Sequence, residues 1–329
     1  MDKKKELISI ILTLYNKASY IEETIFSIYK QTYANRELII VDDCSTDWSL
    51  EIAKSFCEKL WITKKCKFIK NEKNLRVAKT FERWLKEAKW DRISMCDWDD
   101  ILIKNKLEMN LTYCKNNNID FCYSDLVGID ENNNILYSSY FKKHPHVNFK
   151  KHTFKDFIYR WSYAIWSAIF FSKEIWTNLK SIWLPKDLYQ DRWAILYTSV
   201  KWYNIWHINT PLVYYRRCSS CISRARDALH NKSNSNTTVL KKIRNQIFKT
   251  ENCCYKYILE QNIHINNEQK NRCKKHIEIN NLLIDFIEWK NIFMKRQIFK
   301  LLFNLWESKY YIRVLSIQAR KLLTIFSKS

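Results

Sequence analysis

Apolar runs and amphipathic stretches alternate along the first 125 residues of the chain. The runs are rich in β-branched residues, which is typical of strands buried on both faces of a sheet. They occupy residues 7–14, 36–43, 66–70, 91–97 and 119–125. The stretches between them place apolar residues at helical spacing and predict helices. These helices occupy residues 18–31, 76–89 and 104–117, with a fourth that runs from a Ser45–Asp47 cap to about Leu60.

This regular alternation predicts the fold class. Strand, helix, strand and helix in turn favour an α/β fold with a mostly parallel sheet flanked by helices on both faces. In such sheets ligands bind at the carboxyl ends of the strands. We interpret the N-terminal apolar run as a strand and not as a secretory signal, because no small-residue cleavage site follows it.

The pattern changes after Gly128. Residues 126–139 predict a hairpin with a polar tip, residues 162–176 a strand followed by the start of a helix, and residues 203–217 two short strands. Between the last two segments, Gln190 and Asp191 open an amphipathic helix.

The last third of the chain has a different composition. The polar segment 231–238 is typical of a linker, and the Lys-, Asn- and Ile-rich stretches after it predict helices. We therefore expect an α/β domain at residues 1–222 and a basic helical extension at residues 223–329.

Glycine is nearly absent from the sequence, since one Gly stands against 14 Trp. Helix ends commonly need a residue with positive φ, which glycine adopts without strain. Trp61, Trp90 and Trp202 each follow a helical stretch, where such a glycine is expected. One hypothesis is that UGA codons were translated as Trp although the source reads them as Gly. The alternative is a Trp-rich protein whose helices end in other conformations.

Polar side chains gather where three of the predicted strands end. They are Thr13 to Asn16, the pair Asp42 and Asp43, and Asp97 to Asp100. Because the ends of parallel strands meet at one edge of a sheet, we expect these groups to lie close together. Crowded carboxylates usually share a hard cation, and Mg²⁺ or Mn²⁺ accepts one or two of them together with phosphate oxygens. The sequence therefore predicts a divalent cation that carries a nucleotide diphosphate.

Three segments in this order resemble the family 2 glycosyltransferases. They are SIILTLYNKASYIEETIFSIYKQTYANRELIIVDDCSTDWSLEIA, NEKNLRVAKTFERWLKEAKWDRISMCDWDD and YQDRWAILYTSVKWYNIWHINTPLVYYRR. The resemblance covers about residues 6–223 and implies the GT-A fold, with residues 1–222 as the catalytic domain. It also implies a metal-dependent, inverting enzyme of hexosyltransferase type that uses a nucleotide-sugar donor. The family usually has Gly where this chain has Trp48, Trp84, Trp90 and Trp202.

The resemblance implies roles for individual residues at the donor site. Thr13 and Tyr15 would line the nucleotide pocket, Asp43 would bond the uracil or other base, and Arg76 would approach the nucleotide. Asp97 and Asp99 would form the diphosphate and metal motif, with Asp99 as the direct metal ligand.

It also implies a catalytic residue. Asp191 would be the general base that deprotonates an acceptor hydroxyl. The family commonly has Glu before this Asp, and here Gln190 leaves one carboxylate for the work. Arg216 and Arg217 would contact the diphosphate or form a solvated rim.

The charge of the chain allows other partners. The formal net charge is +22, and from Arg224 to Ser329 Lys and Arg outnumber Asp and Glu by 21 to 8. A basic face attracts nucleic acid, anionic lipid or phosphorylated substrates. No recognised nucleic-acid module is present, so a nucleic-acid-binding protein is the alternative that we do not expect. Nucleotidyl transfer would call for a Gly-rich phosphate loop, which TLYNKASY is not.

Composition also bears on the cellular location. The 11 cysteines are scattered, which favours reduced thiols and a cytoplasmic protein. Residues 291–306 combine apolar and basic positions, so they predict a helix that lies on an anionic membrane face or packs on the catalytic domain. The resemblance implies a saccharide or lipid-linked acceptor, polysaccharide or glycolipid synthesis for the cell envelope, and peripheral contact with the inner face of the membrane.

Overall fold

The computed structural model describes most of the first 218 residues and part of the C-terminal third. The described ranges are 5–85, 91–143, 165–180, 203–218 and 265–288, with single residues or short stretches between 191 and 199 and between 249 and 260. The chain divides into two compact units, and the main boundary between them falls after Arg224.

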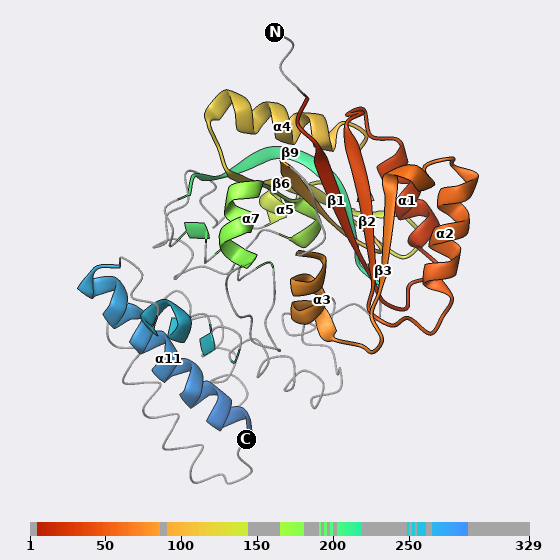
Figure 1. The fold of residues 1–329 in the computed structure, drawn as a ribbon. Helices are drawn as coiled ribbons and strands as arrows, with labels where there is room; N and C mark the ends of the chain where they lie inside the picture. The colour runs from red at the N-terminus through yellow and green to blue at the C-terminus, as the bar shows by residue number, and fades with distance from the viewer. Residues whose placement is uncertain are drawn as a thin grey trace. The chain divides into compact units, whose positions relative to one another are not determined.

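The first half of the α/β unit follows the predicted alternation, with ends shifted by a few residues. In chain order its elements are β1 (Ile8–Leu14), α1 (Ile21–Tyr29), β2 (Arg36–Asp42), α2 (Ser49–Lys59), β3 (Cys66–Lys70), α3 (Arg76–Leu85) and β4 (Arg92–Asp97). Strands β3, β2, β1 and β4 lie side by side and are all parallel. Figure 1 shows β1, β2 and β3 of this group. The predicted α/β fold and the parallel arrangement of these four strands are confirmed.

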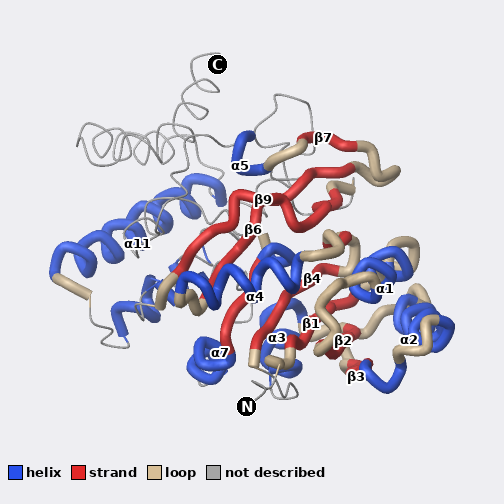
Figure 2. The backbone as a smooth tube through the Cα atoms, turned by 90° about the horizontal axis from the view of Figure 1, so that it is seen from above, coloured by secondary structure: helices blue, strands red, loops and turns tan. Residues whose placement is uncertain are grey.

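The second half completes a mixed sheet. Its elements are β5 (Ile101–Leu102), α4 (Lys106–Asn117), β6 (Phe121–Ile129), β7 (Ile135–Tyr137), α5 (Tyr140–Lys143), β8 (Ile169–Ser172), α7 (Lys173–Lys180) and β9 (Ile205–Arg216). The sheet order is β3-β2-β1-β4-β8-β6-β9-β5, and β7 pairs with β6 as the predicted hairpin. Strand β8 is antiparallel to both of its neighbours, whereas β6 and β9 are parallel to each other. Figure 2 shows β6, β7 and β9 from above.

The prediction of two short strands at residues 203–217 is wrong, because β9 is a single strand of 12 residues. Its pairing with β6 is interrupted: Ser124 faces Ile208, but Asp125 faces Pro211. The extra residues on β9 form a bulge, which accommodates the proline that cannot donate a ladder hydrogen bond. The strand therefore continues past Pro211 to the edge where β1 and β4 end.

The hydrophobic core has a continuous layer on one face of the sheet. Every residue of β1 is buried, as expected for a strand covered on both faces. The alternate residues Ile8, Ile10, Leu12 and Leu14 belong to one cluster with apolar side chains of α1, α2 and α4. Packing in this layer fixes the position of β1 relative to the helices. It therefore also fixes the position of the polar residues that follow β1.

Two tryptophans flank α2 in the left-handed backbone region. Trp48 precedes the helix with φ 67° and Trp61 follows it with φ 56°, and their side chains are 73% and 93% exposed. A non-glycine residue in this region costs roughly 1–2 kcal/mol. Trp84 is different, because it is fully buried within α3. Trp90 and Trp202 lie outside the described residues.

The second unit is described by itself through its helices. Its longest described helix is α11 (Asn267–Glu288), in which His276 stacks on Tyr255 with ring centroids 5.2 Å apart. Among the described residues, no helix is both long and apolar enough to cross a bilayer.

A lysine lies inside the core of the first unit. Lys106, the first residue of α4, is fully buried, and its Nζ donates a 2.7 Å hydrogen bond to Ser94 Oγ of β4. Burial lowers its pKa from 10.5 to about 8. Because the unfolded chain binds this proton more tightly, the penalty is complete below pH 8 and disappears as the pH rises toward 10.5.

We predict that K106M raises the free energy of unfolding at pH 7 by about 2 kcal/mol, after subtraction of the lost Ser94 hydrogen bond. It should also remove the gain in stability that the natural chain shows between pH 8 and pH 10.5. Urea unfolding across this pH range measures both effects. K115M, which removes a half-exposed lysine of the same helix, is the control and should keep the pH dependence. Parallel pH profiles for K106M and the natural chain would contradict the prediction.

Candidate active site

The ends of three neighbouring strands bring the predicted polar residues to one edge of the sheet. In the pairing of β1 with β2, Leu14 faces Asp42, and in the pairing of β1 with β4, Thr13 faces Asp97. Thr13 Oγ1 donates a 3.4 Å hydrogen bond to Asp97 Oδ1. Tyr15 follows β1 and is 38% exposed. The ends of β1, β2 and β4 therefore lie close together, as expected, because of the register in which β1 pairs with β2 and with β4.

Asp43 organises the loop that leads into α3. Its Oδ1 accepts hydrogen bonds from Asn71 Nδ2 at 2.7 Å and from the backbone N–H of Leu75 at 2.8 Å. The carboxylate is nearly buried, at 7% exposure. Arg76 comes next, is exposed and has φ 64°. Asp43 therefore places Arg76 beside the same edge of the sheet.

The three carboxylates between residues 97 and 100 have different surroundings. Asp100 is fully buried, and its carboxylate accepts hydrogen bonds from Ser167 Oγ and, at 2.9 Å, from the backbone N–H of Arg216. Ser167 Oγ also accepts the backbone N–H of Asp97 at 2.8 Å. Asp100 thus links residues 97–100, the acidic loop, to β9 and to the turn before β8. Its role is structural.

The pKa values of Asp97 and Asp99 are both raised. Burial, followed by the charges of Asp99 and Asp191, raises the pKa of Asp97 to about 8. Burial also raises the pKa of Asp99, while the positive charges of Lys17 and Arg216 oppose this rise. Both carboxylates would be stabilised as anions by a cation close to them.

Asp191 comes from a distant part of the sequence, and its charge affects the pKa of Asp97. It is half-buried and helical, and its charge is close enough to Asp97 to raise the pKa of that carboxyl. Gln190 lies outside the described residues. Asp97, Asp99 and Asp191 are therefore neighbours in one electrostatic environment.

The end of β4 offers oxygen ligands for a metal ion. Within the described ranges, no three His, Cys, Asp or Glu side chains form a group that could hold a metal. Asp97 and Asp99 supply oxygen ligands, which suit Mg²⁺ or Mn²⁺, and such ions take the rest of their shell from phosphate and water.

Sequence reasoning missed Lys17. Its backbone N–H donates to Ser49 Oγ at 2.9 Å, and the neighbouring N–H groups of Asn16 and Ala18 donate to Ser45 Oγ at 3.0 Å and Asp47 Oδ2 at 2.9 Å. The residues expected to cap α2 therefore hold the loop after β1, and Trp48 stands at the N-cap. The signal in the sequence was the position of Lys17 directly after the polar cluster that follows β1.

Sequence reasoning also missed Cys218. Its Sγ lies 3.6 Å from Asp99 Oδ2 and 3.9 Å from Lys17 Nζ. It is disulfide-bonded, so the expectation of reduced thiols is wrong for Cys218, whereas eight other described cysteines are free. The spacing of Cys218 and Cys221 in the sequence, Cys-Ser-Ser-Cys, could have marked it.

Arg216 and Arg217 do not form a solvated rim. They are 2% and 8% exposed, and the Arg216 guanidinium is bonded to groups of the protein itself. The expectation of a rim was wrong because β9 extends to Arg216 and is covered there by the hairpin of β6 and β7.

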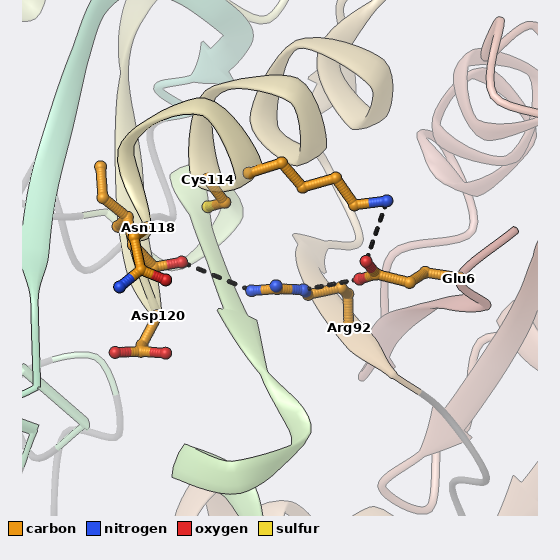
Figure 3. A pocket seen from close by; sticks show the side chains of 7 residues that line it. Glu6, Arg92, Cys114, Asn118 and Asp120 are labelled. Carbon is orange, nitrogen blue, oxygen red and sulfur yellow. Dashed lines mark hydrogen bonds and ion pairs between the residues drawn. The ribbon is translucent and has the colours of Figure 1, made fainter. Parts of the chain in front are cut away.

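A polar cavity of about 590 Å³ lies elsewhere, where β1 and β4 begin (Figure 3). Glu6 pairs there with Arg92 and with Lys115, each at 2.9 Å, and Asp120 also lines the cavity. None of the predicted site residues lines it. We therefore assign the chemistry to the sheet edge that holds Asp43, Asp97 and Asp99, here called the acidic edge, and not to this cavity.

Comparison with known proteins identifies the family. The model of glycosyl transferase family 2 matches residues 9–176. The chain belongs to glycosyl transferase family 2. The match spans β1 to α7, and it includes Asp43, Asp97 and Asp99 but not Asp191.

Curated relatives of this family member match over less than half of its length. An uncharacterized glycosyltransferase of Methanocaldococcus jannaschii is 35% identical over 155 residues, which cover 46% of this chain and 52% of the relative. The UDP-Glc:alpha-D-GlcNAc-diphosphoundecaprenol beta-1,3-glucosyltransferase WfgD of Escherichia coli is 37% identical over 126 residues, covering 38% of this chain and 48% of WfgD. The chain thus spans about half the length of the curated relatives it matches.

Solved structures show the same fold. TarS residues 1–349 from S. aureus superimpose with a TM-score of 0.61 at 18% identity, over 90% of this chain and 78% of that one. The mannosyltransferase PcManGT from Pyrobaculum calidifontis, in complex with GDP-Man and Mn2+, gives a TM-score of 0.53 at 14% identity, over 96% of this chain and 84% of that one. The family 2 chain therefore has the GT-A fold of TarS.

The structural role of Asp100 predicts how its removal changes the free energy of unfolding. D100A leaves the Ser167 hydroxyl and the Arg216 N–H without their buried acceptor, so it should lower the free energy of unfolding by about 2–4 kcal/mol. D99A removes a carboxylate from a repulsive cluster and should change stability by less than about 1 kcal/mol. Urea unfolding of the two variants compares them directly. Equal losses in the two variants would show that Asp100 is not the structural member.

Proposed function

We propose that this chain is an inverting glycosyltransferase of hexosyltransferase type. It moves a sugar from a nucleotide-diphosphate sugar, most simply a UDP-sugar, to an acceptor hydroxyl. The observation that carries the proposal is the electrostatic coupling of Asp97 to both Asp99 and Asp191 at the edge that also holds Asp43. A nucleic-acid-binding function has no comparable support, since none of these carboxylates would favour a polyanion.

Asp97 and Asp99 would hold Mg²⁺ or Mn²⁺, with Asp99 as the direct ligand. A half-buried carboxylate, Asp97, and a buried one, Asp99, both with raised pKa values, fit a divalent cation, which would restore their charged form. When bound, the ion supplies charge stabilisation to the leaving diphosphate. The nucleotide would be bound by Thr13 near the end of β1, Tyr15 after β1, Asp43 after β2 and Arg76 at the start of α3, in keeping with these positions.

Asp191 would act as the general base. It accepts the proton of the acceptor hydroxyl while the acceptor oxygen attacks the anomeric carbon and the bond to the diphosphate breaks. Inversion requires the acceptor to approach from the side opposite the leaving group. Asp191 suits this role because it comes from a different segment than the acidic loop and still lies within electrostatic range of it.

The comparisons support the choice of donor and setting. TarS has been solved in complex with UDP and with UDP-GlcNAc, and the name of WfgD gives UDP-Glc as donor and a diphosphoundecaprenol-linked sugar as acceptor. We extend this to a UDP-sugar donor, a saccharide or lipid-linked acceptor, and cell-envelope polysaccharide or glycolipid synthesis on the cytoplasmic side. Peripheral membrane contact stays a prediction, because residues 291–306 lie outside the described residues.

Two substitutions separate the metal site from the base. D191N should lower transfer about a thousandfold and leave nucleotide-sugar binding intact, because only the proton acceptor is lost. D99A should remove activity together with the response to added Mn²⁺. Transfer from radiolabelled UDP-sugars to a cell lipid extract, with and without chelator, measures activity, and calorimetry measures donor binding.

D120N is the matched control, since Asp120 lines the cavity at the other end of the strands. It should behave like the natural chain in both assays. Near-normal turnover by D191N would refute its role, and full activity of the natural chain in chelator would count against the metal.

We propose in addition that positions 48 and 61 are glycine in the natural protein, as they would be if UGA is translated as Gly. Both residues have positive φ and lie exposed at the ends of α2, so the indoles gain little burial in return for backbone strain. Glycine adopts this conformation without that cost.

W48G and W61G should therefore each raise the free energy of unfolding by about 1 kcal/mol. K59G, at an exposed helical position of the same α2, is the control and should lower it by about 1 kcal/mol. Urea unfolding measures the three variants, and peptide masses of the protein from its source identify the two residues. UGG codons at both positions, or destabilisation by W48G and W61G, would overturn the proposal.

A further inference from the structure

Arg216 occupies an unusual position for a charged residue. It ends β9 and is 2% exposed, and its guanidinium makes bonds to three separate segments. Nε donates to the backbone carbonyl of Asp99 at 2.9 Å. One terminal nitrogen donates to Asn133 Oδ1 at 2.6 Å and to the carbonyl of Asp130 at 3.2 Å. The other pairs with Glu23 Oε2 at 2.6 Å.

The groups around Arg216 are also bonded to one another. Asn133 Nδ2 donates to Glu23 Oε1 at 3.0 Å, so the turn between β6 and β7 is joined to α1. Within that turn, Asp130 Oδ1 accepts the backbone N–H groups of Asn132 at 2.8 Å and Asn134 at 2.9 Å. The guanidinium thus lies at the centre of a closed hydrogen-bond network, which favours one geometry over alternatives.

This network reaches the acidic loop from two sides. The Arg216 side chain holds the Asp99 carbonyl, and its backbone N–H donates to Asp100 Oδ1 at 2.9 Å. On the far side, Thr24 Oγ1 donates to the carbonyl of Trp98 at 2.9 Å. Successive residues of the loop are therefore fixed by α1 and β9, which limits how the Asp99 carboxylate can turn.

We propose that Arg216 is a positioning residue for the metal and diphosphate site, acting through Asp99 and not by contact with the donor. The proposal rests on the proposed function. The guanidinium holds Asp99 in the orientation that binds the cation and ties that orientation to the turn between β6 and β7. Groups that orient metal ligands commonly contribute 10–100-fold to metal affinity.

Lysine is the informative replacement at this position. R216K keeps the positive charge near Asp99 but supplies a single ammonium in place of a planar fork, so it cannot bond the Asp99 carbonyl, Asn133 and Glu23 together. R92K is the matched control. Arg92 is also largely buried, pairs with Glu6 at 2.9 Å and reaches the carbonyl of Ile119 at 3.5 Å, at the opposite ends of the strands.

Electron paramagnetic resonance of Mn²⁺ titrated into the protein with UDP present tests the proposal without turnover. R216K should raise the Mn²⁺ dissociation constant about tenfold, and R92K should leave it unchanged even where both variants lose similar thermal stability. In transfer assays R216K should lower kcat and raise the Mn²⁺ requirement more than the donor KM. An unchanged Mn²⁺ affinity in R216K would overturn the proposal, and so would an equal loss in R92K.

N133G provides a second route if R216K does not fold. Glycine adopts the φ of 67° found at Asn133, so the variant removes one partner of Arg216 without backbone strain. It should weaken Mn²⁺ binding about threefold, and unaltered binding would contradict the proposal. A natural chain that binds Mn²⁺ with UDP but transfers no sugar would instead refute the proposed function. A chain that binds no Mn²⁺ would overturn both.

Discussion

The site depends on the repulsion between the carboxylates at the end of β4 and the carboxylate of Asp191. Asp97 and Asp99 lie two residues apart at the end of β4, and Asp191 adds a third negative charge to the same environment. Lys17 and Arg216 offset part of this charge at Asp99. The β1 register that sets Thr13 beside Asp97 keeps these groups at the edge of the sheet, so the fold maintains an arrangement that a divalent cation and a diphosphate would complete.

The elements with local signals were predictable from the sequence. β1 to β4 are short, apolar and bounded by polar clusters, and their ends define the acidic edge by register alone. The place of Asp43 at that edge follows from the same argument. The hairpin of β6 and β7 was marked by the polar residues at its tip.

The features that sequence reasoning missed depend on contacts between distant residues. Asp100 looks like a third site carboxylate in the sequence, and only its bonds to Ser167 and Arg216 show that it supports the fold. In the sequence Arg216 looks like a surface cation at the end of a strand, but in the structure the turn at Asn133 and the first turn of α1 bind its guanidinium. The two short strands predicted at residues 203–217 are one strand, in which a bulge opposite Asp125 accommodates Pro211.

Anomalous diffraction from a crystal grown with Mn²⁺ and UDP tests the central claim most directly. The account predicts a single strong Mn²⁺ peak that contacts Asp99 and the UDP diphosphate, with Asp97 nearby and Asp191 facing the open side of the diphosphate. UDP bound without metal, or Mn²⁺ bound at a surface that excludes Asp99, would contradict it.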